Sequence, residues 1–428
     1  MKYQFIKYLP APLLLLGFTG VQLKYFDLIF TLNSRWLILL FVFVFVVINK
    51  NFKILFYLKS FLFSILYAIW AIITTIWSEN QLLSMMKSIS LLLVIIASVG
   101  IGIIIVKNNV NNNKSLLDSM IPMVIMFAIS TIFGFDLTSN SLISEKVSMF
   151  QGGTGDSNTF GFYCAMSLPV LLWKLENSIK NKERYFFSAA NILVFLLLIK
   201  SNCRTAIVFA VVIILFFYYW NGKANNLVLL YKGILIVLIV SLLVPDFTEN
   251  AIYNIIYKGN TNGSITESRD TVWQESYNQA ISGGFFGGGY GVTIGEGNDF
   301  TGALSSYGYG REKGNAQLGI IEETGLIGLV LYFISTFWVI IGVQKRLKKC
   351  IDAKEKKLLG IIIGTLLGLF LSSLTEAWYN APGSPESVYY WFIVGIAIGI
   401  SKQDISTDTN SNYINTNNRS VINHSVLV

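Results

Sequence analysis

Long runs of apolar residues, separated by short polar stretches, set the pattern of this sequence. Most runs are long enough, at about 15 to 27 residues, for a helix to cross a hydrocarbon layer about 30 Å thick. They predict about twelve membrane-spanning helices, since each crosses once. These fall at residues 9–30, 36–49, 54–77, 82–106, 116–134, 159–174, 185–199, 205–220, 227–244, 317–343, 358–377 and 387–401. The pattern therefore predicts an all-α fold, a polytopic transmembrane helical bundle.

Lys and Arg residues gather in alternate loops between the predicted spans. If the N-terminus lies in the cytoplasm, most of the 32 Lys and Arg residues fall in cytoplasmic segments, most densely at 345–357. Loops rich in Lys and Arg are retained on the cytoplasmic side of a membrane. Because the predicted number of spans is even, both termini are expected in the cytoplasm.

The predicted spans divide the chain into four parts. Residues 1–244 hold the first nine transmembrane helices, and residues 317–402 hold the last three. Between them, residues 245–316 form a large loop on the periplasmic or extracellular face, far longer than a usual connection and therefore a candidate functional element. Residues 403–428 are rich in Asn, Ser and Thr, so we expect a disordered cytoplasmic tail.

One segment of the large loop has the pattern of an amphipathic helix. Trp273, Tyr277 and Ile281 follow one another at intervals of four residues within 266–281. This spacing places the three apolar side chains on one helix face. We therefore expect this helix to lie at the membrane surface.

Composition excludes several classes of protein. Hydrophobic residues make up 54% of the chain and charged residues 13%, against roughly a quarter charged in soluble domains, which argues against a soluble enzyme. The net charge of +8 comes from scattered loop residues rather than a basic stripe, so nucleic-acid binding is not expected. The three cysteines have no zinc or disulfide spacing. The single histidine, His424, lies in the tail, so no histidine-based catalysis is expected outside.

Three arginines on the predicted outer face are candidates for binding an anion. Arg204 lies at the mouth of a span, Arg269 begins the loop helix, and Arg311 follows with Lys313. A guanidinium beside hydrocarbon is costly unless it faces a cavity or an anion, and an arginine at a helix N-terminus suits a phosphate. Simpler interpretations remain open: Arg204 reaches the interface as a snorkelling side chain, Arg269 pairs with a nearby acid, and Arg311 and Lys313 are solvated charges.

Two further features limit the possible functions. The glycine-rich run GGFFGGGYG at 283–291 lacks the following Lys-Ser or Lys-Thr of a phosphate loop, so it predicts a flexible turn or close backbone packing. Acidic residues are scarce in the predicted spans, and Glu322, Glu323 and Glu376 lie near the ends of two of them. This scarcity argues against an ion-coupled transporter.

The run GNAQLGIIEETGLIG at 314–328 resembles a motif of the O-antigen ligase/polymerase superfamily of bacterial membrane glycosyltransferases. Asn315, Gly325 and Gly328 match the motif in register, and Glu323 stands where the family usually has an acid. The family's ligases carry a histidine at the position that Gly314 takes here. Because that histidine is implicated in catalysis, its replacement favours a Wzy-type polymerase over a ligase.

The resemblance covers about 155 to 330, because three more segments match in order. Asn158 lies in an Asn-x-x-Gly stretch that runs into a span, and Arg204 lies in an S-x-x-R-T-A context. Arg269 and Trp273 precede the Gly-rich turn. The resemblance thus links the outer arginines to the motif at 314–328.

The resemblance implies a polymerase of O-antigen or a related surface polysaccharide in the bacterial cytoplasmic (inner) membrane. Its substrates would be undecaprenyl-diphosphate-linked oligosaccharides, and the growing glycan would pass to a sugar hydroxyl of the next repeat unit. The bilayer and a chain-length regulator are the further partners expected. Because the diphosphate is an activated leaving group, no metal, cofactor or nucleotide sugar is required.

This chemistry suggests a role for each candidate residue. Arg204 and Arg269, with Arg311, would stabilise the negative charge that develops on the leaving diphosphate. Glu323, Asp270 or Glu267 would accept the proton of the acceptor hydroxyl. The residues expected to contact substrate sugar are Asn315, Asn158, Trp273 and Tyr290.

Other functions stay open at this point. An O-antigen ligase would transfer finished polymer to an acceptor. A lipid-linked oligosaccharide flippase or another transporter would share the twelve-span layout, but the sequence shows no two similar halves. A peptidoglycan polymerase would also act on a lipid diphosphate outside, and the motif at 314–328 argues against it.

Overall fold

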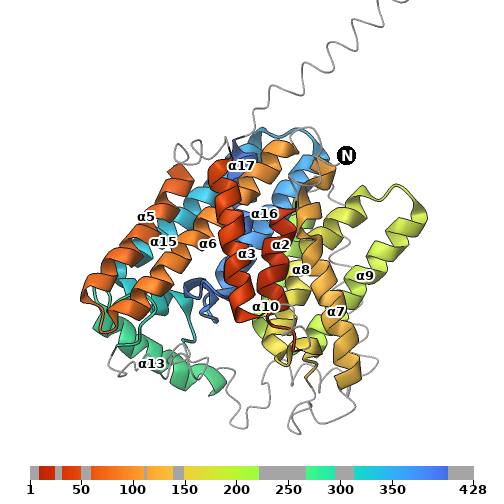
Figure 1. Ribbon diagram of the computed structural model, residues 1–428. Helices are drawn as coiled ribbons and strands as arrows, with labels where there is room; N and C mark the ends of the chain where they lie inside the picture. The colour runs from red at the N-terminus through yellow and green to blue at the C-terminus, as the bar shows by residue number, and fades with distance from the viewer. Residues whose placement is uncertain are drawn as a thin grey trace, which may run out of the picture.

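The computed structural model describes residues 9–24, 31–49, 59–109, 113–137, 149–220, 267–294 and 313–402. Within these ranges every regular element is a helix, as predicted. The helices lie side by side in one bundle, with α13 across one end (Figure 1). The predicted span 227–244, the tail 403–428 and Arg311 lie outside the described residues.

Each predicted span that falls on described residues coincides with a helix. The helices are α2 (Pro10–Gly20), α3 (Leu32–Ile48), α5 (Lys59–Ile73), α6 (Gln81–Asn108), α7 (Ile121–Leu137), α8 (Ser157–Asn177), α9 (Asn181–Lys200), α10 (Arg204–Tyr219), α15 (Ala316–Lys349), α16 (Ala353–Ser372) and α17 (Pro385–Ser401). Short 3-10 helices are η1 (Thr74–Trp77), η2 (Asn113–Met120), η3 (Gly152–Thr154) and η4 (Trp378–Asn380). The amphipathic helix predicted in the loop is α13 (Glu267–Gly283).

The first helix ends earlier than its apolar run predicts. It stops at Gly20, and the turn that follows brings the Lys24 N–H to Gly153 O at 3.2 Å, in η3. The Tyr163 hydroxyl donates to Thr19 O at 2.5 Å near the end of α2. Tertiary contacts with α8 and η3 thus end the helix where hydrophobicity alone would continue it.

Four of the described helical segments are long and apolar enough to cross a membrane by length and composition: Lys59–Trp77, Gln81–Asn108, Ser115–Gly134 and Ala316–Lys349. Three shorter helices are also apolar: Pro10–Gly20, Asn33–Ile48 and Arg204–Tyr219. Large apolar side chains such as Ile48, Ile76 and Ile132 are exposed on the outside, which is unusual for a soluble protein. By these apolar helices the chain is a multi-pass membrane protein, while the total of twelve spans stays a prediction.

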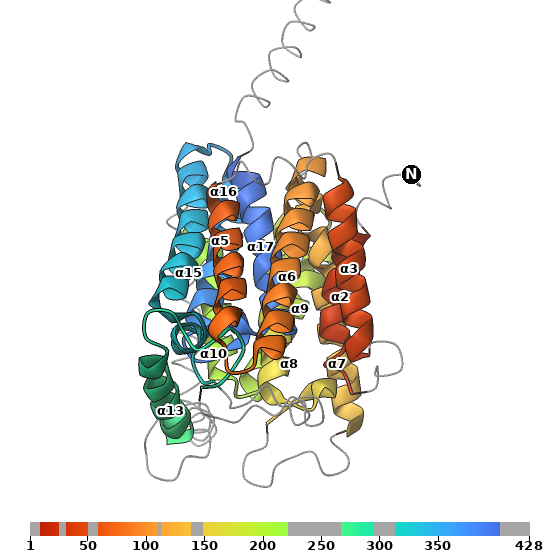
Figure 2. The ribbon, with the colours of Figure 1, turned by 60° about the vertical axis from the view of Figure 1, so that its left-hand side comes forward.

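Helix α17 lies in the middle of the bundle. Nearly all its side chains are buried, and it packs most closely against α6, while α10 packs against α16. Figure 2 shows α13 at the lower end, and the linker between α15 and α16 and the C-terminal end of α17 at the upper end. The basic segment 345–357 is therefore far from α13, as the predicted topology requires.

Candidate functional site

Helix α15 is broken near the end at which α13 lies. Gly325 has φ 70° and ψ −175°, so the helix stops and restarts at this residue. A positive φ is open to glycine at little cost and strained for other residues. A Cβ at Gly325 would also overlap Phe285 O, in the glycine-rich run 283–291. The break therefore requires glycine for its dihedral angles and for the close approach of the glycine-rich run.

The glycine-rich run supplies the backbone hydrogen bonds that the broken helix lacks. Two of its N–H groups donate to α15 carbonyls before the break, and two of its carbonyls accept from N–H groups after it. The bonds are Gly288 N to Glu322 O (2.8 Å), Gly289 N to Glu323 O (3.0 Å), Leu326 N to Gly284 O (3.0 Å) and Ile327 N to Phe285 O (3.4 Å). Broken helices are tolerated at membrane depth when protein groups satisfy the freed backbone in this way. The prediction of close backbone packing at 283–291 is thus confirmed.

Two tryptophans from η1 and α5 also bind this region. Trp70 Nε1 donates to Thr324 O at 2.7 Å, next to the break, and Trp77 Nε1 donates to Gly287 O at 2.8 Å. Both rings pack near Phe286. The break and the glycine-rich run therefore form one fixed unit with the end of α5.

Two carboxylates are buried just before the break, and one lysine pairs with both. Glu322 is 0% and Glu323 3% exposed. Lys313 Nζ lies 2.6 Å from Glu323 Oε1 and 3.4 Å from Glu322 Oε2. Among the described residues, Glu323 Oε2 has no hydrogen-bond partner. The interpretation of Lys313 as a solvated charge is wrong, because the folding of 313–323 turns its side chain, 9% exposed, onto the two acids.

Two buried tyrosines, Tyr67 and Tyr290, hydrogen-bond to Asn380 in η4, and Tyr290 is a predicted site residue. It is 0% exposed, its hydroxyl donates to Asn380 O at 3.0 Å and its N–H donates to Thr74 Oγ1 at 3.1 Å. Tyr67 donates to Asn380 Oδ1 at 3.2 Å. Tyr290 thus lies in the core with its hydroxyl bound to the backbone of η4.

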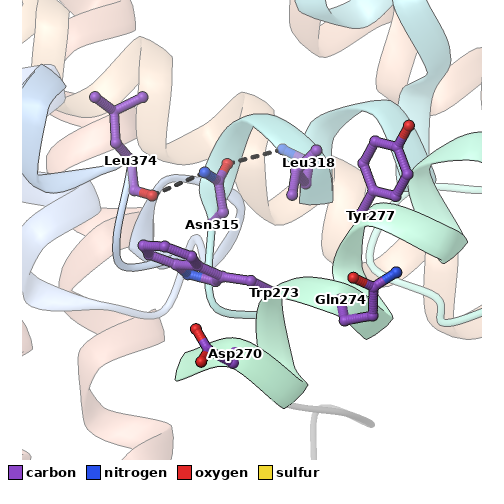
Figure 3. Close-up of a pocket in the computed structure, with 7 residues that line it drawn as sticks. All are labelled: Asp270, Trp273, Gln274, Tyr277, Asn315, Leu318 and Leu374. Carbon is purple, nitrogen blue, oxygen red and sulfur yellow. Dashed lines mark hydrogen bonds between the residues drawn. The ribbon is translucent and has the colours of Figure 1, made fainter. Parts of the chain in front are cut away.

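A pocket of about 440 Å³ lies between α13 and the start of α15. Its lining is Asp270, Trp273, Gln274, Tyr277, Asn315, Leu318 and Leu374 (Figure 3). The volume falls within the range of about 300–1,000 Å³ usual for small-molecule sites. Trp273 and Asn315, both predicted to contact substrate, meet in this pocket.

Trp273 and Asn315 also hold the pocket together. Trp273 Nε1 donates to Gly314 O at 3.0 Å. Asn315 caps α15, since its Oδ1 accepts from Leu318 N at 3.0 Å and its Nδ2 donates to Leu374 O at 2.8 Å. A Cβ at Gly314 would lie 2.8 Å from Trp273 Cδ1. The indole thus occupies the space that a side chain at 314 would need.

The N-terminal end of α10 reaches the same region. Arg204 is half-buried in its first turn. The next residue, Thr205, hydrogen-bonds through its hydroxyl to Thr375 Oγ1 at 2.9 Å. Thr375 follows Leu374, which lines the pocket. The structure therefore links the α10 terminus to the pocket through 374–375.

The remaining candidates lie around this region or outside the described parts. The backbone of Arg269 is in the first turn of α13, directly before Asp270 of the pocket lining. Asn158 is in the first turn of α8, where Asp156 caps the helix by accepting from Asn158 N at 3.3 Å. The structure thus brings Trp273 and Asn315 together and places Arg204 nearby through Thr205. It buries Glu323 beside Lys313 and Tyr290 beside Asn380.

Sequence reasoning missed the burial of Lys313 beside the two acids and of Asn380 beside the tyrosines. Lys313 stands one residue before the matched motif and was grouped with Arg311 as a loop charge. Asn380 lies in a polar stretch after α16, and its 8% exposure arises only from the fold. Two adjacent acids near a span were the available signal, because buried carboxylates require a cation nearby.

The fold and this site define a multi-pass membrane protein with a polar pocket and buried charges near one end of its bundle. Residues 189–333 match a protein-family model described as O-antigen ligase. The match contains Arg204, Arg269, Trp273 and Glu323, and ends within α15. No curated protein sequence matches the chain. Residues 189–333, about a third of the chain, are therefore similar to the O-antigen ligase family, whose members are membrane enzymes that transfer glycans.

Proposed function

We propose that this protein is a polymerase of O-antigen or a related surface polysaccharide. The observation that supports polymerase over ligase is the packing of Trp273 on Gly314. The family's ligases have a catalytic histidine at this position, and here an indole fills the space. The enzyme would act on undecaprenyl-diphosphate-linked oligosaccharides at the outer face of the bacterial inner membrane, together with a chain-length regulator.

The proposed reaction moves a glycan from one lipid carrier to another. The bond between the anomeric carbon and the diphosphate oxygen of the donor breaks, and undecaprenyl diphosphate leaves with the bonding electrons. A hydroxyl oxygen of the acceptor repeat unit forms the new glycosidic bond and gives its proton to a base. No oxidant, reductant or nucleotide is consumed.

Arg204 and Arg269 are proposed to stabilise the leaving diphosphate. A guanidinium keeps its charge at any relevant pH and binds phosphate oxygens with two parallel hydrogen bonds. Arg204 at the end of α10 and the backbone of Arg269 at the start of α13 both lie near the pocket end of the bundle. Arg311, in the same predicted loop, is proposed as a third cation, and Asn158 as a further substrate contact on α8.

The acceptor hydroxyl would lose its proton to Asp270 or Glu323. Asp270 lines the pocket and is exposed, whereas Glu323 is buried beside Lys313. The exposure of Asp270 supports it as the base for a hydroxyl held in the pocket. Glu323 would be the base for an acceptor hydroxyl that reaches the buried cluster of Lys313, Glu322 and Glu323. Turnover of Asp270→Asn and of Glu323→Gln, each measured at a normal protein level, distinguishes the two candidate bases. The base is the residue whose substitution abolishes turnover.

The proposal is tested by a gel of surface polysaccharide from a strain deleted for this gene and complemented with variants. In the deletion strain, a single capped repeat unit should replace the polymer ladder, and the wild-type gene should restore the ladder. Arg204→Ala and Arg269→Ala should not restore the ladder. Lysine at either position should restore it partly, because the positive charge remains while the two parallel hydrogen bonds of the guanidinium are lost. Arg184→Ala, an exposed arginine at the start of α9, is the matched control and should restore the ladder.

Other outcomes point to the other functions. Complete polymer that accumulates on its lipid carrier in the deletion strain would show a ligase. Loss of even single repeat units from the surface would show a flippase. A normal ladder with both Arg204→Ala and Arg269→Ala would overturn the site assignment.

A further inference from the structure

We propose that the pocket between α13 and α15 binds a neutral sugar of the acceptor glycan. This inference rests on the proposed function and names the substrate group that the pocket holds. The pocket is built from two helices and the segment after α16. The argument depends on its aromatic walls, its polar groups and its position.

The aromatic residues of the pocket suit the apolar face of a sugar ring. A pyranose presents C–H groups on its faces and hydroxyls at its edge, and an aromatic ring packs against such a face. Trp273 is half-buried and held by the bond from its Nε1 to Gly314 O, so the ring is fixed in place. Tyr277, one turn further along α13, is 55% exposed. The Trp and Tyr side chains each combine a large apolar ring surface with a polar N–H or O–H group.

The polar groups of the pocket suit hydroxyls rather than phosphates. Asp270 can only accept hydrogen bonds when ionised, while the Gln274 amide offers both donors and an acceptor. Sugar hydroxyls do both, so they can satisfy either residue. The described lining contains a carboxylate and no Lys or Arg. A diphosphate would be repelled by Asp270 and is better placed at the arginines.

The walls of the pocket are firmly positioned. Ser276 and Ala280 of α13 are 0% and 5% exposed, and α13 packs extensively against α15. The opposite wall is fixed by Asn315, which bonds to Leu318 N and Leu374 O. Binding sites on packed helices keep their geometry, so little ordering is required when ligand binds.

The position of the pocket fits an acceptor. Leu374 forms part of its lining, and the next residue, Thr375, bonds to Thr205, which follows Arg204. A sugar in the pocket would therefore lie close to a diphosphate held by Arg204. Transfer between two lipid-linked substrates requires the acceptor hydroxyl and the donor's anomeric carbon to be neighbours.

The test measures sugar binding to the full chain in lipid nanodiscs. The probe is a set of oligosaccharide fragments made by mild acid hydrolysis of the host's own surface polysaccharide, titrated by saturation-transfer NMR. Tyr277→Ala and Gln274→Ala should each raise the Kd about fivefold to tenfold, as for the loss of one stacking or hydrogen-bonding partner. Ser282→Ala is the matched control, exposed on the same helix outside the pocket, and should bind as the wild type does.

Two results would overturn the inference. One is equal binding of the fragments to the wild type and to both pocket variants. The other is no fragment binding to the wild type, with a lipid acyl chain found in the pocket instead. Failure of the proposed function is a separate result, because it is read from an intact ladder in the deletion strain.

Discussion

Lys313 Nζ lies 2.6 Å from Glu323 Oε1 and 3.4 Å from Glu322 Oε2, and all three side chains are shielded from solvent. A buried carboxylate is costly unless a cation and hydrogen bonds compensate it. Lys313 directly precedes the motif, and its partners Glu322 and Glu323 lie three and two residues before the break at Gly325. The contact between Lys313 and the two glutamates therefore connects the segment before α15 to the part of α15 beside its break.

Removing this lysine should destabilise the protein strongly. Lys313→Met leaves two buried carboxylates beside an apolar side chain, and loss of one partner of a buried ion pair costs about 3–5 kcal/mol. We expect a lower unfolding midpoint in detergent by circular dichroism, and partial recovery in Lys313→Met/Glu323→Gln. Lys348→Met, an exposed position on α15, should change stability by at most about 0.5 kcal/mol. Equal stability of the two single variants would contradict the role of the pair.

Two glycines of α15 should respond differently to the same substitution. Gly325→Ala places a Cβ at φ 70° and against Phe285 O, so we expect a loss of at least about 1–3 kcal/mol. Gly342→Ala meets only Ser401 at 3.5 Å and should be neutral or stabilising by up to about 1 kcal/mol. Thermal unfolding in detergent measures both. A stable Gly325→Ala protein would show that the break is not required.

A histidine introduced at position 314 should disturb the packing of Trp273. In Gly314→His the new side chain meets Trp273, since a Cβ there already lies 2.8 Å from Trp273 Cδ1. We expect reduced folded protein and loss of the ladder, with the protein level recovering in Gly314→His/Trp273→Ala. Membrane protein level by immunoblot and the polysaccharide gel give the two readouts. Normal level and ladder in the single variant would refute the packing argument.

The predicted sidedness can be checked by labelling introduced cysteines. Ser282→Cys on α13 should react with a membrane-impermeant maleimide on intact cells whose outer barrier is opened. Ile351→Cys, 91% exposed between α15 and α16, should react only after the inner membrane is opened. The reverse pattern would invert the topology.

Background labelling should be low in this experiment. Cys164, Cys203 and Cys350 are all buried. Burial, followed by the nearby Glu355 carboxylate, raises the pKa of Cys350 to about 12. A raised pKa keeps the thiol protonated below that pH, and the thiolate is the form that reacts. Wild-type protein should therefore take up little maleimide at pH 7 to 8, a result that a labelled wild type would contradict.

The helical elements follow from local patterns in the sequence. Apolar runs of membrane length predict helices because the backbone must satisfy its own hydrogen bonds in hydrocarbon, and each described run is a helix. Trp273, Tyr277 and Ile281 predicted α13. The missing phosphate-loop residues predicted either a flexible turn or close backbone packing at 283–291, and the structure shows the packing. These features depend on the types and spacing of residues that are close together in the sequence.

The positions of the buried charges and of the pocket depend on the tertiary fold. Lys313 became a buried counter-ion, and Tyr290 became a core residue, because distant segments fold over them. The early end of α2 at Gly20 depends on η3 and α8. The pocket likewise depends on α13 docking against α15 and on 374–375. Such features arise from contacts between residues far apart in sequence, and hydrophobic periodicity carries information only about neighbours along one helix.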